Sequence, residues 1–208
     1  MKITKFDHSG FLIEKDGRGL VMDPVEYQNK LPEFRNLDVV IVTHLHGDHY
    51  QPEVIAKIRE ANPGVKVFTT ADSTELIGEG GVVVKSGDKI TAGVFELEFY
   101  GEDHAEIVSG QVPCGNIGVM VDGVLANSGD SFAIPPQTPE ILLVPVSAPW
   151  LKSDETMTFI KAVKPKLAIP THDALNSELG NTIYDNWIGK ACEEAECEYK
   201  NIHYGEII

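Results

Sequence analysis

The stretch Thr43-His44-Leu45-His46-Gly47-Asp48-His49 places three imidazoles and one carboxylate within six residues. It directly follows Leu37–Val42, a nearly continuous apolar run rich in β-branched residues, which is typical of a strand buried on both faces. Gly47 allows the backbone to turn back tightly, so that Asp48 and His49 can face a second ion beside the first. Imidazole nitrogens and carboxylate oxygens suit zinc, iron or manganese. The sequence therefore predicts a metal site where a core strand ends, against the alternative of a surface loop that is histidine-rich by chance.

These seven residues resemble the His-x-His-x-Asp-His signature of the metallo-β-lactamase fold superfamily, which needs further ligands from later in the chain. Three candidates stand in the expected order, each after a strand-like run: His104, Asp130 and His172. Catalytic groups are commonly placed in such loops, where a rigid sheet holds them. Taken singly, His104 or His172 could be an ordinary surface or capping histidine. Their order, together with the histidine-rich stretch, favours ligation.

The resemblance implies a binuclear centre. One ion would be held by His44, His46 and His104 and the other by Asp48, His49 and His172, with Asp130 bridging the pair. This set leaves open positions for water, which is typical of a catalytic site. Two divalent ions, zinc first and manganese or iron as alternatives, can share a hydroxide and polarise a carbonyl or phosphoryl oxygen. The implied reaction is hydrolysis of a small-molecule ester, lactone or phosphodiester. Asp48 is the candidate catalytic residue, because its carboxylate could orient the hydroxide and carry a proton.

Two short residue pairs near the start of the chain resemble one particular branch of the superfamily. His8-Ser9 and Asp23-Pro24 look like the opening of the lactonase-like branch, which includes relatives of ascorbate-6-phosphate lactonase. In that branch such pairs flank the metal cleft. His8 is therefore a candidate for a group that faces the substrate or supports a ligand, or else a capping histidine at a strand end. Asp23 could orient a ligand imidazole through its free ring nitrogen, or could simply start a turn.

Local patterns predict alternating strands and helices without repeats or linkers. The expected strands are 2–6, 10–14, 19–22, 37–42, 65–68, 82–84, 90–91, 95–100, the run 117–125 broken by a turn at Asp122-Gly123, 140–146 and 166–169. The expected helices are 52–61, 71–77, 153–163 with Ser153 as its cap, and 178–195. Early hairpins followed by β-α units suit two sheets packed face to face with helices outside both. The pattern alone favours an α/β or α+β class; the resemblance implies a four-layer αββα sandwich, expected here as a single domain over residues 1–208.

The charge and composition of the chain limit the binding partners that we expect. The chain carries 32 acidic and 17 basic residues, a net charge of −15, so most of its surface should repel a nucleic acid backbone. No apolar stretch is long enough for a bilayer, and the first residues turn polar too soon for a secretory signal. The cysteines Cys114, Cys192 and Cys197 lack paired spacing and are expected to be reduced thiols. We therefore expect a cytoplasmic protein with a small-molecule substrate, no nucleic acid or membrane partner, and homo-oligomerisation as the default.

Other functions of this fold fit the sequence less well. Diiron oxidoreductases typically carry Glu where His46 stands and add a flavin-binding domain, and this sequence has neither. True β-lactamases are secreted and usually have Cys at the position of Asp130. Thiolester hydrolases of the glyoxalase type share the ligand set but are longer. A non-catalytic metal-binding module stays open as an alternative, although no ligand of the set has been lost.

Overall fold

Two β-sheets form the centre of the molecule. The computed structural model describes residues 1–73, 78 and 80–208. The first sheet has six strands in the order β1 to β6. Their bounds are β1 Lys2–Lys5, β2 Phe11–Lys15, β3 Arg18–Met22, β4 Leu37–Ile41, β5 Lys66–Thr69 and β6 Gly81–Val83. The first three strands pair antiparallel and the next three continue in parallel, with helix α1 (Pro52–Ala61) connecting β4 to β5.

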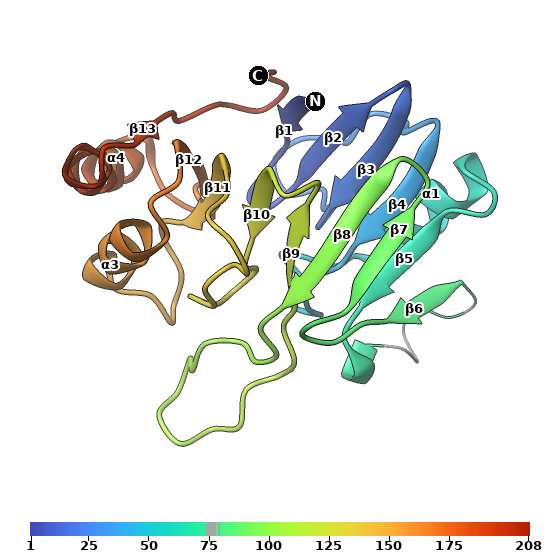
Figure 1. The fold of residues 1–208 in the computed structure, drawn as a ribbon, viewed down its shortest axis with the longest axis horizontal. Helices are drawn as coiled ribbons and strands as arrows, with labels where there is room; N and C mark the ends of the chain where they lie inside the picture. The colour runs from blue at the N-terminus through green and yellow to red at the C-terminus, as the bar shows by residue number, and fades with distance from the viewer. Residues whose placement is uncertain (74–77, 79) are drawn as a thin grey trace.

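The second sheet has seven strands in the order β13 to β7. Their bounds are β7 Lys89–Ala92, β8 Phe95–Tyr100, β9 Gly118–Val121, β10 Leu125–Asn127, β11 Ile141–Pro145, β12 Leu167–Thr171 and β13 Glu198–Tyr199. Antiparallel pairing from β7 to β10 gives way to parallel pairing from β10 to β13. Helix α3 (Ser153–Val163) connects β11 to β12, and α4 (Glu178–Ala195) connects β12 to β13. Figure 1 shows both helices together beside the second sheet.

Three apolar clusters define the layers. Phe11, Ile41, Phe99 and Ile169 belong to a large buried cluster that both sheets share. The outward face of the first sheet packs on α1, and that of the second packs on α3 and α4. Along β4, alternate residues enter the shared cluster and the α1 cluster, which is why this strand is apolar on both faces. The predicted αββα arrangement is confirmed.

The local predictions differ from the structure in three main places. The short strand β13 was not among the expected strands. Lys152, not Ser153, is the N-cap of α3; its backbone N–H donates to Glu155 Oε2 at 2.8 Å, while Ser153 is already the first helical residue. Of the helix expected over 71–77, residues Ala71–Ser73 form the 3-10 turn η1, and the remainder lies outside the described residues. Every helix in the described part of the chain is too short or too polar to span a bilayer.

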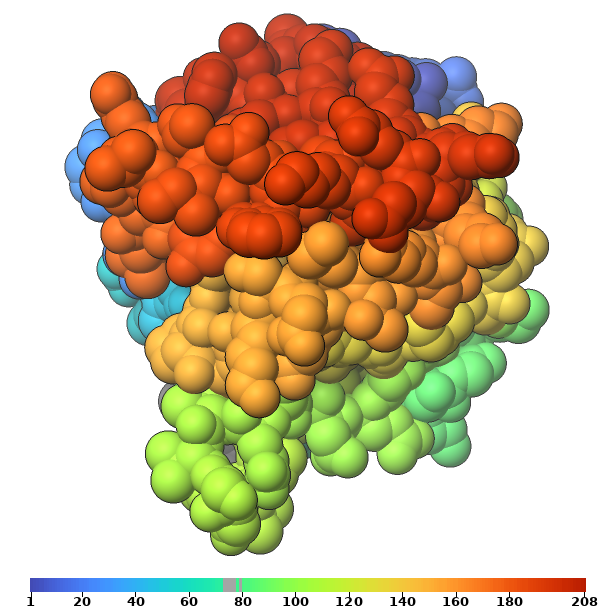
Figure 2. Space-filling view, turned by 90° about the vertical axis from the view of Figure 1, so that its left-hand side faces the viewer, coloured from blue at the N-terminus to red at the C-terminus, as the bar shows by residue number. Residues whose placement is uncertain are grey.

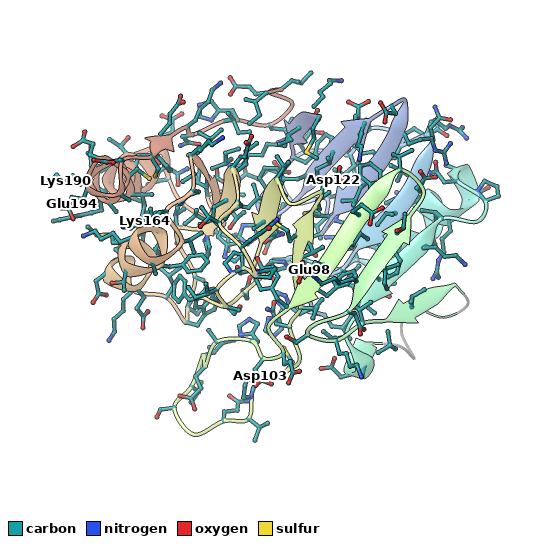
Figure 3. All side chains as sticks on the ribbon, in the orientation of Figure 1. Glu98, Asp103, Asp122, Lys164, Lys190 and Glu194 are labelled. Carbon is teal, nitrogen blue, oxygen red and sulfur yellow. The ribbon has the colours of Figure 1, made fainter. Side chains whose placement is uncertain are left out.

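A long loop between β8 and β9 extends away from the sheets (Figures 1 and 2). Its base is closed by an antiparallel bridge between Asp103, labelled in Figure 3, and Gly115. The backbone N–H of His104 donates to Cys114 O at 3.0 Å inside the same bridge. The loop therefore leaves the sheet as a paired ribbon, and His104 stands at its rigid base.

Candidate metal centre

Strand ends bring the predicted ligands together. His44, His46, Asp48 and His49 follow β4, His104 follows β8, Asp130 follows β10 and His172 follows β12. Because β4 lies in one sheet and the other strands in the second, the site spans the edge where the two sheets meet. His44, His49, His104, Asp130 and His172 are each at most 3% exposed. All seven residues of the predicted set fall into clusters compact enough to hold an ion.

The first cluster contains His44, His46, His104 and Asp130. His44 Nε2 lies 3.0 Å from His46 Nδ1, and His104 Nε2 lies 3.2 Å from Asp130 Oδ2. His44 and His46 thus direct different ring nitrogens toward the same candidate ion position. Two residues separated by a single residue can do this where the backbone turns. These four residues match the ligands expected for the first ion together with the bridging carboxylate.

The second cluster forms a tight triangle. His49 Nε2 and His172 Nε2 each lie 3.0 Å from Asp130 Oδ1, and 3.1 Å from each other. Asp130 therefore directs one carboxylate oxygen to each histidine cluster. Asp48 also groups with His44 and His49, which places its carboxylate beside both clusters.

His8 lies within the site. Its ring stacks on that of His172 with centroids 4.5 Å apart, and its Nε2 lies 3.2 Å from Asp48 Oδ2. The neighbouring Ser9 hydroxyl donates to the backbone oxygen of Asp48 at 2.9 Å. The pair singled out in the sequence thus holds Asp48 from both its side chain and its backbone. Because His8, His49 and His172 also form a compact cluster, His8 is close enough to serve as an alternative ligand.

Buried hydrogen bonds orient the imidazoles. Asp23 is fully buried and accepts from the Thr43 backbone N–H, the Thr43 hydroxyl and His49 Nδ1, all at 2.8 Å. A proton on Nδ1 leaves Nε2 of His49 free to bind a cation. His104 likewise donates from Nδ1 to Ala105 O at 2.5 Å, which frees its Nε2. The arrangement therefore selects the tautomers that a metal requires.

Three residues of the site have a strained backbone. His8, Asp23 and His172 have φ angles of 59°, 40° and 65°, in the left-handed region that L-residues rarely adopt. Such conformations cost free energy and persist where surrounding contacts impose them, commonly at functional sites. Here they turn the chain at the ends of β1, β3 and β12, so that each side chain points to the cluster.

The ionisation of the site residues favours a bound cation. Burial would raise the pKa of Asp130, but the imidazoles of His172 and His49 outweigh it and hold that pKa well below its ordinary value. Burial opposes protonation of His49, yet Asp130 and Asp23 raise its pKa well above the usual value. Burial lowers the pKa of His44 well below its usual value, so that its ring is neutral. A cation at the His49 triangle would thus take the place of a proton.

Two buried atoms support the same interpretation. His104 Nε2 and Asp130 Oδ1 are inaccessible to solvent and form no hydrogen bond of good geometry. Polar atoms that are buried without partners are costly, and proteins rarely retain them without a function. Divalent cations between these atoms would satisfy both. The donor set of imidazole nitrogens and carboxylate oxygens fits zinc, manganese or iron.

Trp150 is a site residue that sequence reasoning missed. It lies in the loop after β11, and its indole Nε1 donates to Asp130 Oδ2 at 2.8 Å. Like the candidate ligands, Trp150 follows a predicted strand, but tryptophan does not bind metals, so its position alone carries no signal of a metal site. Cys114 also approaches the site, with Sγ 3.8 Å from His46 Nε2, and burial raises the pKa of its thiol.

The fold and this cluster define a class. Two mixed sheets between helices, with histidines and aspartates gathered at one edge from the ends of β4, β8, β10 and β12, make the metallo-β-lactamase architecture. The model of the beta-lactamase superfamily domain matches residues 2–172, and the chain belongs to this superfamily. The match includes every candidate ligand. Membership in the lactonase-like branch stays a prediction.

The chain is similar to proteins from several organisms. Protein Rv0786c of Mycobacterium tuberculosis is 27% identical over 190 residues, covering 88% of this chain and 89% of that protein. The UPF0173 metal-dependent hydrolase MK1542 of Methanopyrus kandleri is 28% identical, with 83% and 84% covered. Igni18, a metallo hydrolase from Ignicoccus hospitalis, has a solved structure that matches with a TM-score of 0.74 at 20% identity, covering 100% of this chain and 97% of that one. This last likeness is one of fold.

Proposed function

We propose that this chain is a metal-dependent hydrolase, one domain over residues 1–208, that cleaves a small-molecule ester, lactone or phosphodiester at a binuclear site. The observation that carries the proposal is the position of Asp130, which directs its two oxygens to two separate histidine clusters. Similarity to MK1542, itself described as a metal-dependent hydrolase, supports it.

The residues have distinct duties in this proposal. His44, His46 and His104 would hold one ion, Asp48, His49 and His172 would hold the other, and Asp130 would be shared by both. Two metal ions held by these residues would supply a hydroxide nucleophile at neutral pH and would polarise the substrate oxygen. Asp23 and Ala105 O fix the ring protons of His49 and His104 away from the centre.

The carboxylate of Asp48 lies where it can transfer a proton from the attacking water to the leaving group. Its side chain is 27% exposed, whereas that of Asp130 is 5% exposed, so Asp48 faces the side from which substrate enters. His8 Nε2, 3.2 Å away, holds one of its oxygens in place. The other oxygen can accept the proton of an attacking water and return it to the leaving group.

Metal content and isotope incorporation test the function. Protein reconstituted with zinc, manganese or iron should hold close to two ions per chain. It should cleave at least one member of a panel of lactones, phosphodiesters and other esters without any redox partner, and oxygen-18 from labelled water should enter the acid product. Less than half an ion per chain, or cleavage that is independent of metal across the panel, would contradict the proposal. Oxygen consumption driven by a flavoprotein donor would favour the diiron oxidoreductase alternative.

A further inference from the structure

A small pocket opens directly onto the candidate centre. Its volume is about 210 Å³, below the usual size of a site for a drug-sized ligand. One side is formed by site residues and by Ser147. The other side is apolar and comes from the loops after β8, β11 and β12; it consists of Ile107, Ala148, Pro149, Trp150 and Leu175. We name these five residues the apolar wall.

The described lining of this pocket contains neither lysine nor arginine. An adjoining pocket of about 220 Å³ shares His46, His104 and Ile107 with it, and its described lining likewise lacks both residue types. Residues 74–77 and 79 also include neither of them. The buried Lys5 lines a different pocket, and its Nζ is paired with Asp173 Oδ2 at 2.6 Å. An anionic group on the acyl chain of a substrate would therefore meet neither lysine nor arginine among the residues described as lining these two pockets, in a chain of net charge −15.

Trp150 gives the apolar wall a fixed shape. Its indole N–H is bound to Asp130, and its ring packs edge-on against Phe132 with centroids 5.3 Å apart. Leu175 and Ile107 instead remain 63% and 47% exposed at the mouth. An apolar substrate chain lying over Trp150 would cover these two side chains and remove apolar surface from water.

We propose that the substrate carries a small, uncharged, apolar acyl group that lies along the apolar wall, and that esters and lactones with an uncharged acyl chain are preferred over those with a charged one. This inference rests on the proposed function and narrows its substrate class. Charged acyl chains lose hydration at the wall and gain no ion pair in return.

Two matched esters test the class directly. p-Nitrophenyl pentanoate and p-nitrophenyl 4-sulfobutanoate differ at the far end of the acyl chain, in methyl against sulfonate, and sulfonate is a weak metal ligand. The zinc-loaded protein should show a kcat/KM at least tenfold higher for the pentanoate. Equal values, or preference for the sulfonate or for the cationic 5-aminopentanoate ester, would overturn the inference while leaving the hydrolase intact.

A charge placed in the wall should change this preference. Leu175→Lys adds a cation at an exposed wall position, and it should shift the ratio of kcat/KM toward the sulfonate ester by at least fivefold. Leu179→Lys is the matched control, because Leu179 is 71% exposed on α4 and is not among the described residues lining the pocket. Equal shifts in the two variants would show that overall charge decides the preference, and the wall assignment would then be wrong.

If neither ester is cleaved, a binding measurement tests the inference instead. That outcome counts against the proposed function, so the pocket is then tested without turnover. Trp187→Phe leaves Trp150 as the single tryptophan, since the chain has two. Titration of the zinc-loaded variant with pentanamide should change the Trp150 fluorescence at concentrations at least fivefold lower than with 4-sulfobutanamide. Equal concentrations for the two amides, or a lower one for 4-sulfobutanamide, would overturn the inference.

Discussion

Asp23→Asn would test how the metal centre is oriented. Asp23 contacts no substrate and lies outside the predicted ligand set, yet its Oδ2 accepts from His49 Nδ1 and from the Thr43 hydroxyl. Asparagine has the same shape and tolerates the φ angle of 40° at this position, so the fold should persist. Its Oδ1 can still accept from the Thr43 backbone N–H. Its amide NH₂ then replaces Oδ2 and faces His49.

This replacement reverses the hydrogen bond to His49. An NH₂ group can only donate, so the proton of His49 must leave Nδ1 for Nε2, the atom that lies 3.0 Å from Asp130. A protonated Nε2 cannot bind a cation. Loss of such a supporting partner typically lowers metal affinity by about 10- to 100-fold, or about 1.4 to 2.8 kcal/mol. We expect this loss at the ion beside His49, whereas the ion held by His44, His46 and His104 should be much less affected.

Zinc competition with a chromophoric chelator measures the two affinities, and nitrogen-15 NMR of the imidazoles reports the tautomer of His49. Asp7→Asn is the matched control. Asp7 is also buried and its carboxylate accepts three hydrogen bonds, from the backbone and side chain of Asn29 and the backbone of Gln28, none of which involves an imidazole. Both variants should lose some stability, and only Asp23→Asn should lose zinc. Wild-type affinity for both ions in Asp23→Asn would refute the orienting role.

Three other perturbations follow from the structure. Asp130→Ala should lose one ion, loosen the other and lower activity by several orders of magnitude, whereas the exposed His203→Ala should do little; equal metal content by elemental analysis would exclude a bridging role. Trp150→Phe keeps a ring but removes the donor to Asp130, so activity should fall about 10- to 100-fold with little change in urea midpoint. Phe99→Ala empties the fully buried cluster between the sheets and should cost about 3–5 kcal/mol in urea unfolding, and a loss below 1 kcal/mol would mean that the cavity collapses.

The layers of the fold, and the gathering of the candidate ligands at strand ends, were predictable because they depend on local patterns. The strand at 37–41 is apolar on both faces since each face contacts a separate cluster, and that leaves a continuous apolar run in the sequence. The candidate ligands follow strand ends and include imidazoles, which carry a chemical meaning wherever they stand. The N-cap of α3 was assigned one residue too late, because Ser153 has the favoured cap side chain while the bond that closes this helix comes from the backbone of Lys152.

The support around the candidate ligands could be predicted only in part. Short residue pairs near the start of the chain indicated His8 and Asp23, but the partners of His8 and the role of Trp150 depend on contacts between loops distant in sequence. His8 and Asp48 are 40 residues apart, and Trp150 lies 20 residues beyond Asp130. Tryptophan and leucine have no preferred partner that a sequence reveals, so the apolar wall appears only when three loops are placed together. The ligands indicate which chemistry is available, whereas these loop side chains decide which substrate can reach it. Two chains with the same metal ligands can therefore differ in substrate through positions such as Ile107 and Leu175, which leave the metal centre unchanged.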